Sequence, residues 1–256
     1  MIIYTCLTIL AHERQDMIFT ENRIVEVLDT NSNDTIRPSA LLRFMQEAAN
    51  HNMRKCRPTY EELFADGLAF ILSRMSVKCY DTIHAYDELT VQTWPVYGRG
   101  VTFPRSYRIL RDGKVVAEGD STWALVDTKN RRLLKCDEID MSSYTFDEAI
   151  CLPLRFRIPR DAQMCKVGEH EVAYSETDCN RHMNNPNYPD MICNFIPEID
   201  KKEVREFIIS FASEAPYKER LSVEMLDAPD EDGVYYFRTL KSGATNIEAR
   251  VVTKEI

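Results

Sequence analysis

The chain of 256 residues repeats one order of predicted elements, in which a helix is followed by a run of strands. In the first half, Pro38 begins a helical pattern whose apolar face holds Leu41, Phe44, Met45, Ala48 and Ala49. In the second half, Pro186 and Pro189 lie near the start of another helical pattern, whose apolar face holds Tyr188, Met191, Ile192 and Phe195. This repeated order predicts two copies of one α+β module.

The strands that follow each helix are rich in β-branched and aromatic residues. They are expected at 68–80, 88–97, 101–110 and 115–126 in the first half, and at 204–213, 220–226, 234–240 and 246–252 in the second. Asp112-Gly113 and Ser242-Gly243 are typical of hairpin turns between neighbouring strands. A short helix is predicted before the first strand, with Thr59 and Glu62 in a capping-box pattern and Gly67 at its end.

A helix followed by consecutive antiparallel strands buries its apolar face when the sheet curls around it. This arrangement is the hotdog fold, so the sequence predicts a tandem (double) hotdog, each half being a long helix wrapped by an antiparallel sheet. The predicted domains are 1–135, a linker at 136–166, and 167–256. The closest internal match aligns 71–76 with 208–213 and thereby sets Val77 opposite Glu214. Because the polar stretch 29–34 upstream of Pro38 contains no histidine and no Asn-Asn pair, chemistry is expected in the second half only.

Composition and charge exclude several classes of protein. With 44% hydrophobic residues, the chain can form a packed core. A net charge of −9 argues against nucleic-acid or membrane-surface partners for the chain as a whole. The start MIIYTCLTIL has no basic residues, so neither a signal peptide nor a membrane span is expected. The eight cysteines include no CxxC pair and are expected to be mostly buried thiols of a cytoplasmic protein, with no metal and no cofactor.

Acid, amide and imidazole alternate at a spacing of two in the stretch SETDCNRHMNNPNYPDM, residues 175–191. Within it, DCNRHMNNPNYPD resembles the D-x-N-x-H-x-N-N-x-x-Y signature of the acyl-acyl carrier protein (acyl-ACP) thioesterases. RMSVKCYDTIHAYDELTVQTWP, STWALVDTKNRRLLK and SFASEAPYKERLSV are similar to other segments of that family. The resemblance implies hydrolysis of fatty acyl-ACP, which releases the fatty acid and ends chain elongation.

The same resemblance implies four catalytic residues, Asp178, Asn180, His182 and Glu214. Glu214 would act as the base for an attacking water, and burial would strengthen it in that role. Asn180 and His182 could hold the water, donate to the oxyanion or protonate the thiolate, and Asp178 would orient its neighbours. Plant members carry a cysteine after the glutamate, where this chain has Ala215, so water rather than a thiol is the expected nucleophile. Cys179 is expected to be buried and turned away by strand alternation.

Substrate contacts are expected from both halves. The first half should hold the acyl chain, and acidic acyl carrier protein should dock on a basic patch. The candidate substrate-binding residues are Trp94, Tyr107, Trp123, Asn184 and Tyr188, although Asn184 with Asn185 also suits a helix cap. The candidate docking residues are Arg99, Arg105, Arg108, Arg111, Arg131 and Arg132.

Other functions are compatible with the same residues. An acyl-CoA thioesterase would use the same site, a hotdog hydratase or dehydratase would act on an enoyl group, and a binding module would hold acyl-ACP without cleaving it. Turnover assays on each substrate would separate them. A homodimer is a further candidate assembly.

Overall fold

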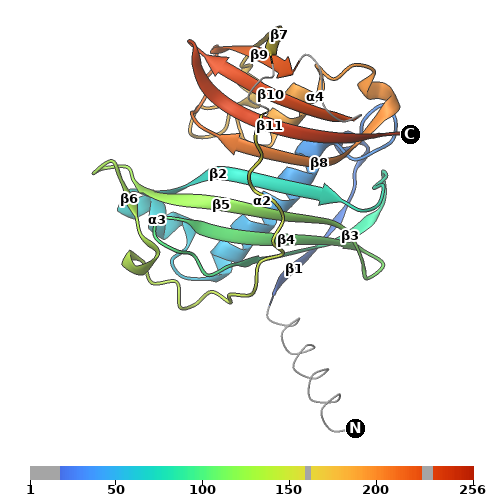
Figure 1. Cartoon of the computed structure of the whole chain (residues 1–256). Coiled ribbons are helices and arrows are strands. Elements are labelled where there is room, and N and C mark those ends of the chain that lie inside the picture. The colour runs from blue at the N-terminus through green and yellow to red at the C-terminus, as the bar shows by residue number, and fades with distance from the viewer. Residues whose placement is uncertain (1–17, 159–162, 227–232) are drawn as a thin grey trace.

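The computed structural model describes residues 18–158, 163–226 and 233–256 (Figure 1). The start of the chain, expected to be neither a signal peptide nor a membrane span, lies outside these residues, as does Cys6. Eleven antiparallel strands form one continuous sheet. No helix in the described ranges is long and apolar enough to cross a membrane.

From residue 18 onward, where the description begins, the first half of the chain supplies six strands and two α-helices. The helices are α2 (Pro38–Lys55) and α3 (Tyr60–Asp66), with short 3₁₀ turns at Val27–Asp29 and Cys136–Glu138. The strands are β1 (Phe19–Ile24), β2 (Leu68–Cys79), β3 (Glu88–Pro95), β4 (Phe103–Arg111), β5 (Lys114–Asp127) and β6 (Arg132–Leu134). Helix α2 lies behind the sheet of this half in the view of Figure 1.

Within its described ranges, 163–226 and 233–256, the second half supplies five strands and one α-helix. The helix is α4 (Asn187–Cys193), with 3₁₀ turns at Tyr174–Glu176 and Ile199–Lys201. The strands are β7 (Met164–Glu171), β8 (Lys202–Phe211), β9 (Arg220–Leu226), β10 (Val234–Lys241) and β11 (Ala244–Glu255). The two edge strands, β1 and β7, were not expected from the sequence, because their mostly polar residues do not read as strands.

Strand order shows that the halves are two copies of one module. The order is β1-β3-β4-β5-β2 in the first half and β8-β11-β10-β9-β7 in the second, and β2 pairs with β8 at the centre. The predicted double hotdog is therefore confirmed. The two helices differ in length, because α2 has eighteen residues and α4 only seven. The second half thus covers its sheet with a shorter helix than the sequence led us to expect.

Local sequence signals agree with the structure where backbone chemistry dominates. Helix α2 begins at Pro38, and the five apolar residues predicted on its inner face are all buried. Thr59 and Glu62 form the expected capping box of α3, which ends at Gly67 in the left-handed conformation. Both predicted hairpin turns join antiparallel neighbours, β4 to β5 and β10 to β11.

The equivalence that set Val77 opposite Glu214 is wrong. Two hydrogen bonds occupy the same place in each module, Ile36 N to Ile83 O in the first half and Met183 N to Ala215 O in the second. These bonds make Ile83 the counterpart of Ala215, and therefore Thr82 the counterpart of Glu214. Val77 instead lies within β2, fully buried and paired with Phe207. The short apolar match misled because strand cores of similar composition align at several registers.

The segment after β6 runs as an extended strap across the outer face of the first-half sheet (Figure 1). Trp94 Nε1 donates to Glu148 O at 2.9 Å, and Leu152 N donates to Asp120 Oδ2 at 2.7 Å. Burial raises the pKa of Asp120, although hydrogen bonds from Ser106 and the strap oppose this effect. The strap lies within the predicted linker 136–166, whose last residues overlap the start of β7. The domain limits remain predictions.

Candidate active site

His182 and Glu214 meet where two loops of the second half run side by side. Met183 N donates to Ala215 O at 2.8 Å, and a β-bridge joins His182 to Pro216. This backbone pairing brings His182 Nδ1 to 3.2 Å from Glu214 Oε2. A carboxylate beside an imidazole is a common arrangement for moving protons in catalysis.

Asp178 and Asn180 belong to the same tight turn as His182. Asp178 N donates to His182 O at 3.0 Å, and Arg181 adopts a left-handed φ of 66°. Asn180 N donates to Asp178 Oδ1 at 2.8 Å, and its Nδ2 lies 3.4 Å from Oδ2. Asp178 therefore holds Asn180 in place, as aspartates commonly do in turns. The structure brings the four sequence-predicted residues into one pair of adjacent loops.

Two expectations about the surroundings of this site are wrong. Glu214 was expected to be buried, but it lies in the loop after β8, which ends at Phe211, and its side chain is 58% exposed. Cys179 was expected to be buried, but it lies in the turn and is exposed. Strand alternation does not apply in a turn, which is why the argument failed. Of the seven described cysteines, all free, Cys193 alone is buried.

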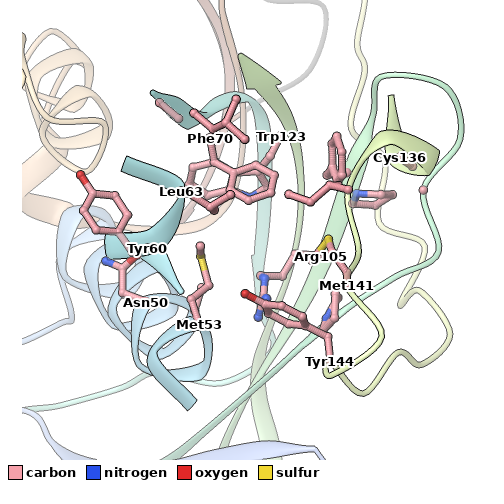
Figure 2. Close-up of a pocket in the computed structure, with 18 of the residues that line it drawn as sticks. Asn50, Met53, Tyr60, Leu63, Phe70, Arg105, Trp123, Cys136, Met141 and Tyr144 are labelled. Atoms are coloured by element: carbon pink, nitrogen blue, oxygen red, sulfur yellow. The ribbon is translucent and has the colours of Figure 1, made fainter. Parts of the chain in front are cut away.

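A cavity of about 680 Å³ lies next to the catalytic turn, mainly within the first half. Figure 2 shows its walls, with Asn50 and Met53 on α2, Tyr60 and Leu63 on α3, and Phe70 and Trp123 on the sheet. Asn180 is a lining residue from the second half. Burial raises the pKa of the Tyr60 phenol, and the charges of the nearby Cys179 and Asp178 add to this effect. The cavity therefore reaches from the first-half interior to the turn that contains Asn180.

Of the five predicted substrate-binding residues, Trp123 lines this cavity. Trp94 is buried against the strap, and Tyr107 is buried in the core with its hydroxyl 3.3 Å from Ser121 Oγ. Tyr188 is buried on α4, where its hydroxyl accepts from Asn246 Nδ2 at 3.3 Å, and burial raises its pKa to about 12. Asn184 is exposed, and its N–H donates to Glu176 O. None of these four lines the cavity, so aromatic content alone did not locate it.

The cavity residues that sequence reasoning missed come largely from α2 and α3. Gln46, Asn50 and Met53 follow one another at helical spacing along α2, beside its apolar face. Tyr60 and Phe64 lie one turn apart on α3. A polar strip beside an apolar helix face was the available signal, but it also fits an ordinary solvated helix edge.

The predicted docking arginines do not form one surface. Arg105 is buried and lines the cavity, so that prediction is wrong. Arg108 pairs with Glu118 at 3.2 Å, and Arg111 pairs with Asp81 and Asp87 at 2.5 and 2.6 Å. These bonds, that to Asp87 first, raise the pKa of Arg111. Arg132 pairs with Glu138 at 2.6 Å, while Arg99 and Arg131 are exposed without an ion pair to any described carboxylate.

The arginines also lie at opposite ends of the sheet. Arg111 is at the β4–β5 hairpin, whereas Arg131 and Arg132 follow the far end of β5, roughly 40 Å away at strand rise. Glu214 follows the end of β8 that lies beside the start of β2, and Leu68 of β2 pairs with Asp127. Arg131 and Arg132 are therefore at the catalytic end of the sheet, and Arg111 is at the other end.

No group of three or more His, Cys, Asp or Glu side chains is arranged to hold a metal within the part of the chain that the structure describes. The fold and the site define a double-hotdog protein with an apolar cavity beside an acid–imidazole pair.

Comparisons with known proteins show which family this double-hotdog chain resembles. The family model for the acyl-ACP thioesterase N-terminal domain matches residues 16–142. An acyl-ACP thioesterase from Bacteroides thetaiotaomicron is similar in structure with a TM-score of 0.81, at 19% identity over 94% of this chain and 99% of that one. A 12:0-ACP thioesterase from Umbellularia californica is similar with a TM-score of 0.78, at 15% identity over 94% of this chain and 98% of that one. At these identities the structural likeness shows the fold. No curated protein sequence matches the chain.

The chain belongs to the acyl-ACP thioesterase family. Its reaction is hydrolysis of the thioester of fatty acyl-ACP, so it is a thioester hydrolase.

Proposed function

We propose that Glu214 and His182 carry this hydrolysis, with Asn180 and Asp178 in support, and that the first-half cavity holds the acyl chain. The single observation that carries the proposal is the 3.2 Å contact of His182 Nδ1 with Glu214 Oε2, beside a cavity of about 680 Å³ to which Asn180 contributes. Glu214 can accept a proton in this contact, and the mostly apolar cavity that Asn180 lines suits an acyl chain.

The reaction follows from these positions. The Oε2 atom of Glu214 contacts His182, which leaves Oε1 for a water. As the water oxygen bonds to the thioester carbonyl carbon, its proton passes to Glu214. The side-chain amide of Asn180 donates to the developing oxyanion. Collapse breaks the carbon–sulfur bond, the proton returns to the departing thiolate, and the products are a fatty acid and the carrier's free thiol.

The exposure of Glu214 adds a requirement. A carboxylate surrounded by water is a weak base, and exclusion of water strengthens it. Since the Glu214 side chain is 58% exposed in the free chain, the arriving substrate must cover it. We propose that the phosphopantetheine arm and the carrier protein do so. Binding energy from parts of the substrate remote from the thioester then raises the rate of the chemical step.

A docking surface lies around the catalytic pair. Lys241 Nζ donates to Glu214 O at 2.5 Å, and Arg181 and Lys218 are exposed in the two catalytic loops. None of the three forms an ion pair with a carboxylate among the described residues. The exposed aromatic pair of Tyr174 and Tyr217 lies beside them. We propose that these five residues, here called the mouth surface, receive acidic acyl carrier protein.

Hydrolysis of carrier-bound chains would end fatty-acid elongation, and the cytoplasm is the proposed setting. A homodimer and the absence of nucleic-acid and membrane partners remain predictions from the sequence. The test is product analysis after incubation with acyl-ACPs of several chain lengths, using wild type and Glu214→Gln. Free fatty acid should appear with wild type only. Release from acyl-CoA at an equal rate would favour the acyl-CoA thioesterase, and an enoyl or hydroxyacyl product without free thiol would favour a hydratase or dehydratase.

A further inference from the structure

The cavity proposed to hold the acyl chain contains a buried guanidinium. Arg105 belongs to β4, is 8% exposed and lines the cavity. Figure 2 shows its side chain among apolar neighbours that include Met53 and Tyr144. Arg105 and Tyr144 both line this cavity. A hydrocarbon chain alone would have no use for a cation at this place.

The protein supplies hydrogen-bond acceptors for only some of the N–H groups of this guanidinium. Arg105 Nη1 donates to Asn52 Oδ1 at 3.1 Å and to Thr93 Oγ1 at 3.2 Å, and Nη2 donates to Asn52 Oδ1 at 3.2 Å. These bonds use three of the five N–H donors of an arginine and leave two. Both acceptors are neutral, and no described carboxylate lies within ion-pair distance. Burial accordingly lowers the pKa of Arg105.

A second donor in the same cavity is also unpaired. Gln46 lines the cavity from α2, and its Nε2 is buried with no hydrogen-bond partner among the described residues. Buried amides are almost always hydrogen-bonded in proteins, so the Gln46 amide is a donor that the described residues leave unused. Arg105 and Gln46 both offer donors. The missing partner is therefore an acceptor.

We propose that Arg105 binds oxygen on the acyl chain, with Gln46 as a second donor in the same cavity, so that the cavity prefers acyl groups bearing a hydroxyl or carboxylate remote from the thioester. The proposal rests on the proposed function for the identification of this cavity as the acyl site. An unsubstituted chain would exclude water from these donors without offering them an acceptor. Donors that are buried and unpaired in this way cost free energy. Sites built to hydrogen-bond a substrate oxygen discriminate strongly against analogues that lack it.

The direct test is binding of free acids by titration calorimetry, which does not depend on catalysis. The probes are unsubstituted, ω-hydroxy and α,ω-dicarboxylic acids of eight, ten and twelve carbons. Wild type should bind at least one oxygenated acid at least tenfold more tightly than the unsubstituted acid of equal length. The hydroxy and dicarboxylic series tell which oxygen function the subsite takes. Arg105→Met should lose the preference, while Met53→Leu, a change in the same wall, should keep it.

Two results would overturn the subsite. One is wild type binding the unsubstituted acid as tightly as its oxygenated counterparts at all three lengths, and this comparison needs no variant. The other is a preference that survives in both Arg105→Met and Gln46→Leu, which would show that Arg105 serves only to join α2 to the sheet and that Gln46 does not contact the ligand. Turnover of the matching acyl-pantetheine thioesters separates the proposals, because a chain that binds oxygenated acids without hydrolysing their thioesters would refute the proposed function and keep the subsite.

Discussion

The loops at residues 31–35 and 178–182 have the same backbone geometry but make different side-chain contacts. In each loop the first residue's N–H bonds the fifth residue's carbonyl, as in Asn31 N to Thr35 O and Asp178 N to His182 O. The fourth residue is left-handed in both, Asp34 in the first and Arg181 in the second. The modules therefore repeat the geometry of the loop, and any difference in function must come from side chains and surroundings.

The first loop is closed by contacts with the other half. Asn33, the counterpart of Asn180, donates from Nδ2 to Lys202 O at 2.8 Å, and its Oδ1 accepts from Thr35 Oγ1 at 2.8 Å. Thr82, the counterpart of Glu214, donates to Glu203 Oε2 at 3.0 Å. The side chains of Asn33 and Thr82 are thus used to hold the loop together and to join the halves. The first loop therefore serves to connect the two halves.

The second loop meets a different surface. Where the first loop faces the polar start of β8, Asn180 faces a cavity walled by the start of β2, including Phe70, and by α3. No partner from the first half takes up the Glu214 carboxylate among the described residues. Two copies of one loop therefore differ in function because one is satisfied within the protein and the other is left for a ligand.

The largest expected effect is at the acid and its counterpart. Glu214→Gln should lower kcat about 10²–10⁴-fold, the usual contribution of a general base, with the melting temperature unchanged. Thr82→Val should leave kcat unchanged and reduce the free energy of unfolding by about 1 kcal/mol through its lost hydrogen bonds. Steady-state kinetics and thermal unfolding of both variants give the result. A loss of less than tenfold in Glu214→Gln would remove Glu214 from its proposed role.

The amide pair should show the same contrast on a smaller scale. Asn180→Ala should lower kcat about 10–10²-fold, because an oxyanion donor is lost, and should leave stability near wild type. Asn33→Ala should destabilise the fold by about 1–3 kcal/mol, since it leaves buried partners unpaired, and should spare kcat. Chemical denaturation measures the free energy of unfolding of each variant, and steady-state kinetics measures its kcat. If Asn180→Ala and Asn33→Ala changed kcat and the free energy of unfolding equally, the proposed difference in function between the two loops would be contradicted.

Charge reversal tests the mouth surface against the opposite end of the sheet. Lys218→Glu should raise KM for acyl-ACP about three- to tenfold at low salt. The effect should shrink as the ionic strength rises and the Debye length falls below its physiological value of about 8 Å. Arg111→Glu, at the far end, is the matched control and should leave KM unchanged. A small neutral thioester should show neither effect. A KM that responds to Arg111 rather than to Lys218 would move the docking surface away from the catalytic pair.

A buried acid joins the helices of the two halves and should make their packing sensitive to pH. Asp190 of α4 accepts from Ser39 N of α2 at 2.9 Å, and burial raises the pKa of Asp190 despite that bond. A raised folded-state pKa means that the folded chain binds the proton more tightly than the unfolded chain, whose value is about 3.9. The contribution of Asp190 to stability is therefore present below pH 3.9 and is lost as pH rises through the folded-state pKa.

The comparison variant is Asp190→Asn, which imitates the protonated acid. Its free energy of unfolding minus that of wild type should grow as pH rises above about 4, measured by urea denaturation at several pH values. A difference that stays constant with pH would show that Asp190 is not the titrating group.

The smallest expected effect is at Cys179, which is exposed in the catalytic turn. Cys179→Ala should keep most activity, and intact-mass spectra of quenched turnover should show no acyl adduct, because water attacks directly in the proposed mechanism. A stable adduct on Cys179 would replace water with a covalent route and leave the hydrolase assignment unchanged.

Sequence alone determined the features that depend on local chemistry. The apolar face of α2, the capping box at Thr59 and Glu62, and the Asp112-Gly113 hairpin each depend on a few neighbouring residues. The repeated order of helix and strands was sufficient for the double hotdog, and the DCNRHMNNPNYPD stretch pointed to the catalytic turn. These signals are readable because periodicity, capping and turn preferences act over short distances along the chain.

Only the tertiary structure decided which residues surround the substrate and which surface stays open. The counterpart of Glu214 is Thr82 because of hydrogen bonds between loops, which no local match could reveal. Arg105 is buried in the cavity, and Glu214 is exposed, since each depends on where β4, β8 and α2 come to lie. A strand pattern fixes that a side chain alternates between faces, but whether a face meets solvent, a helix or a cavity is set by elements distant in sequence.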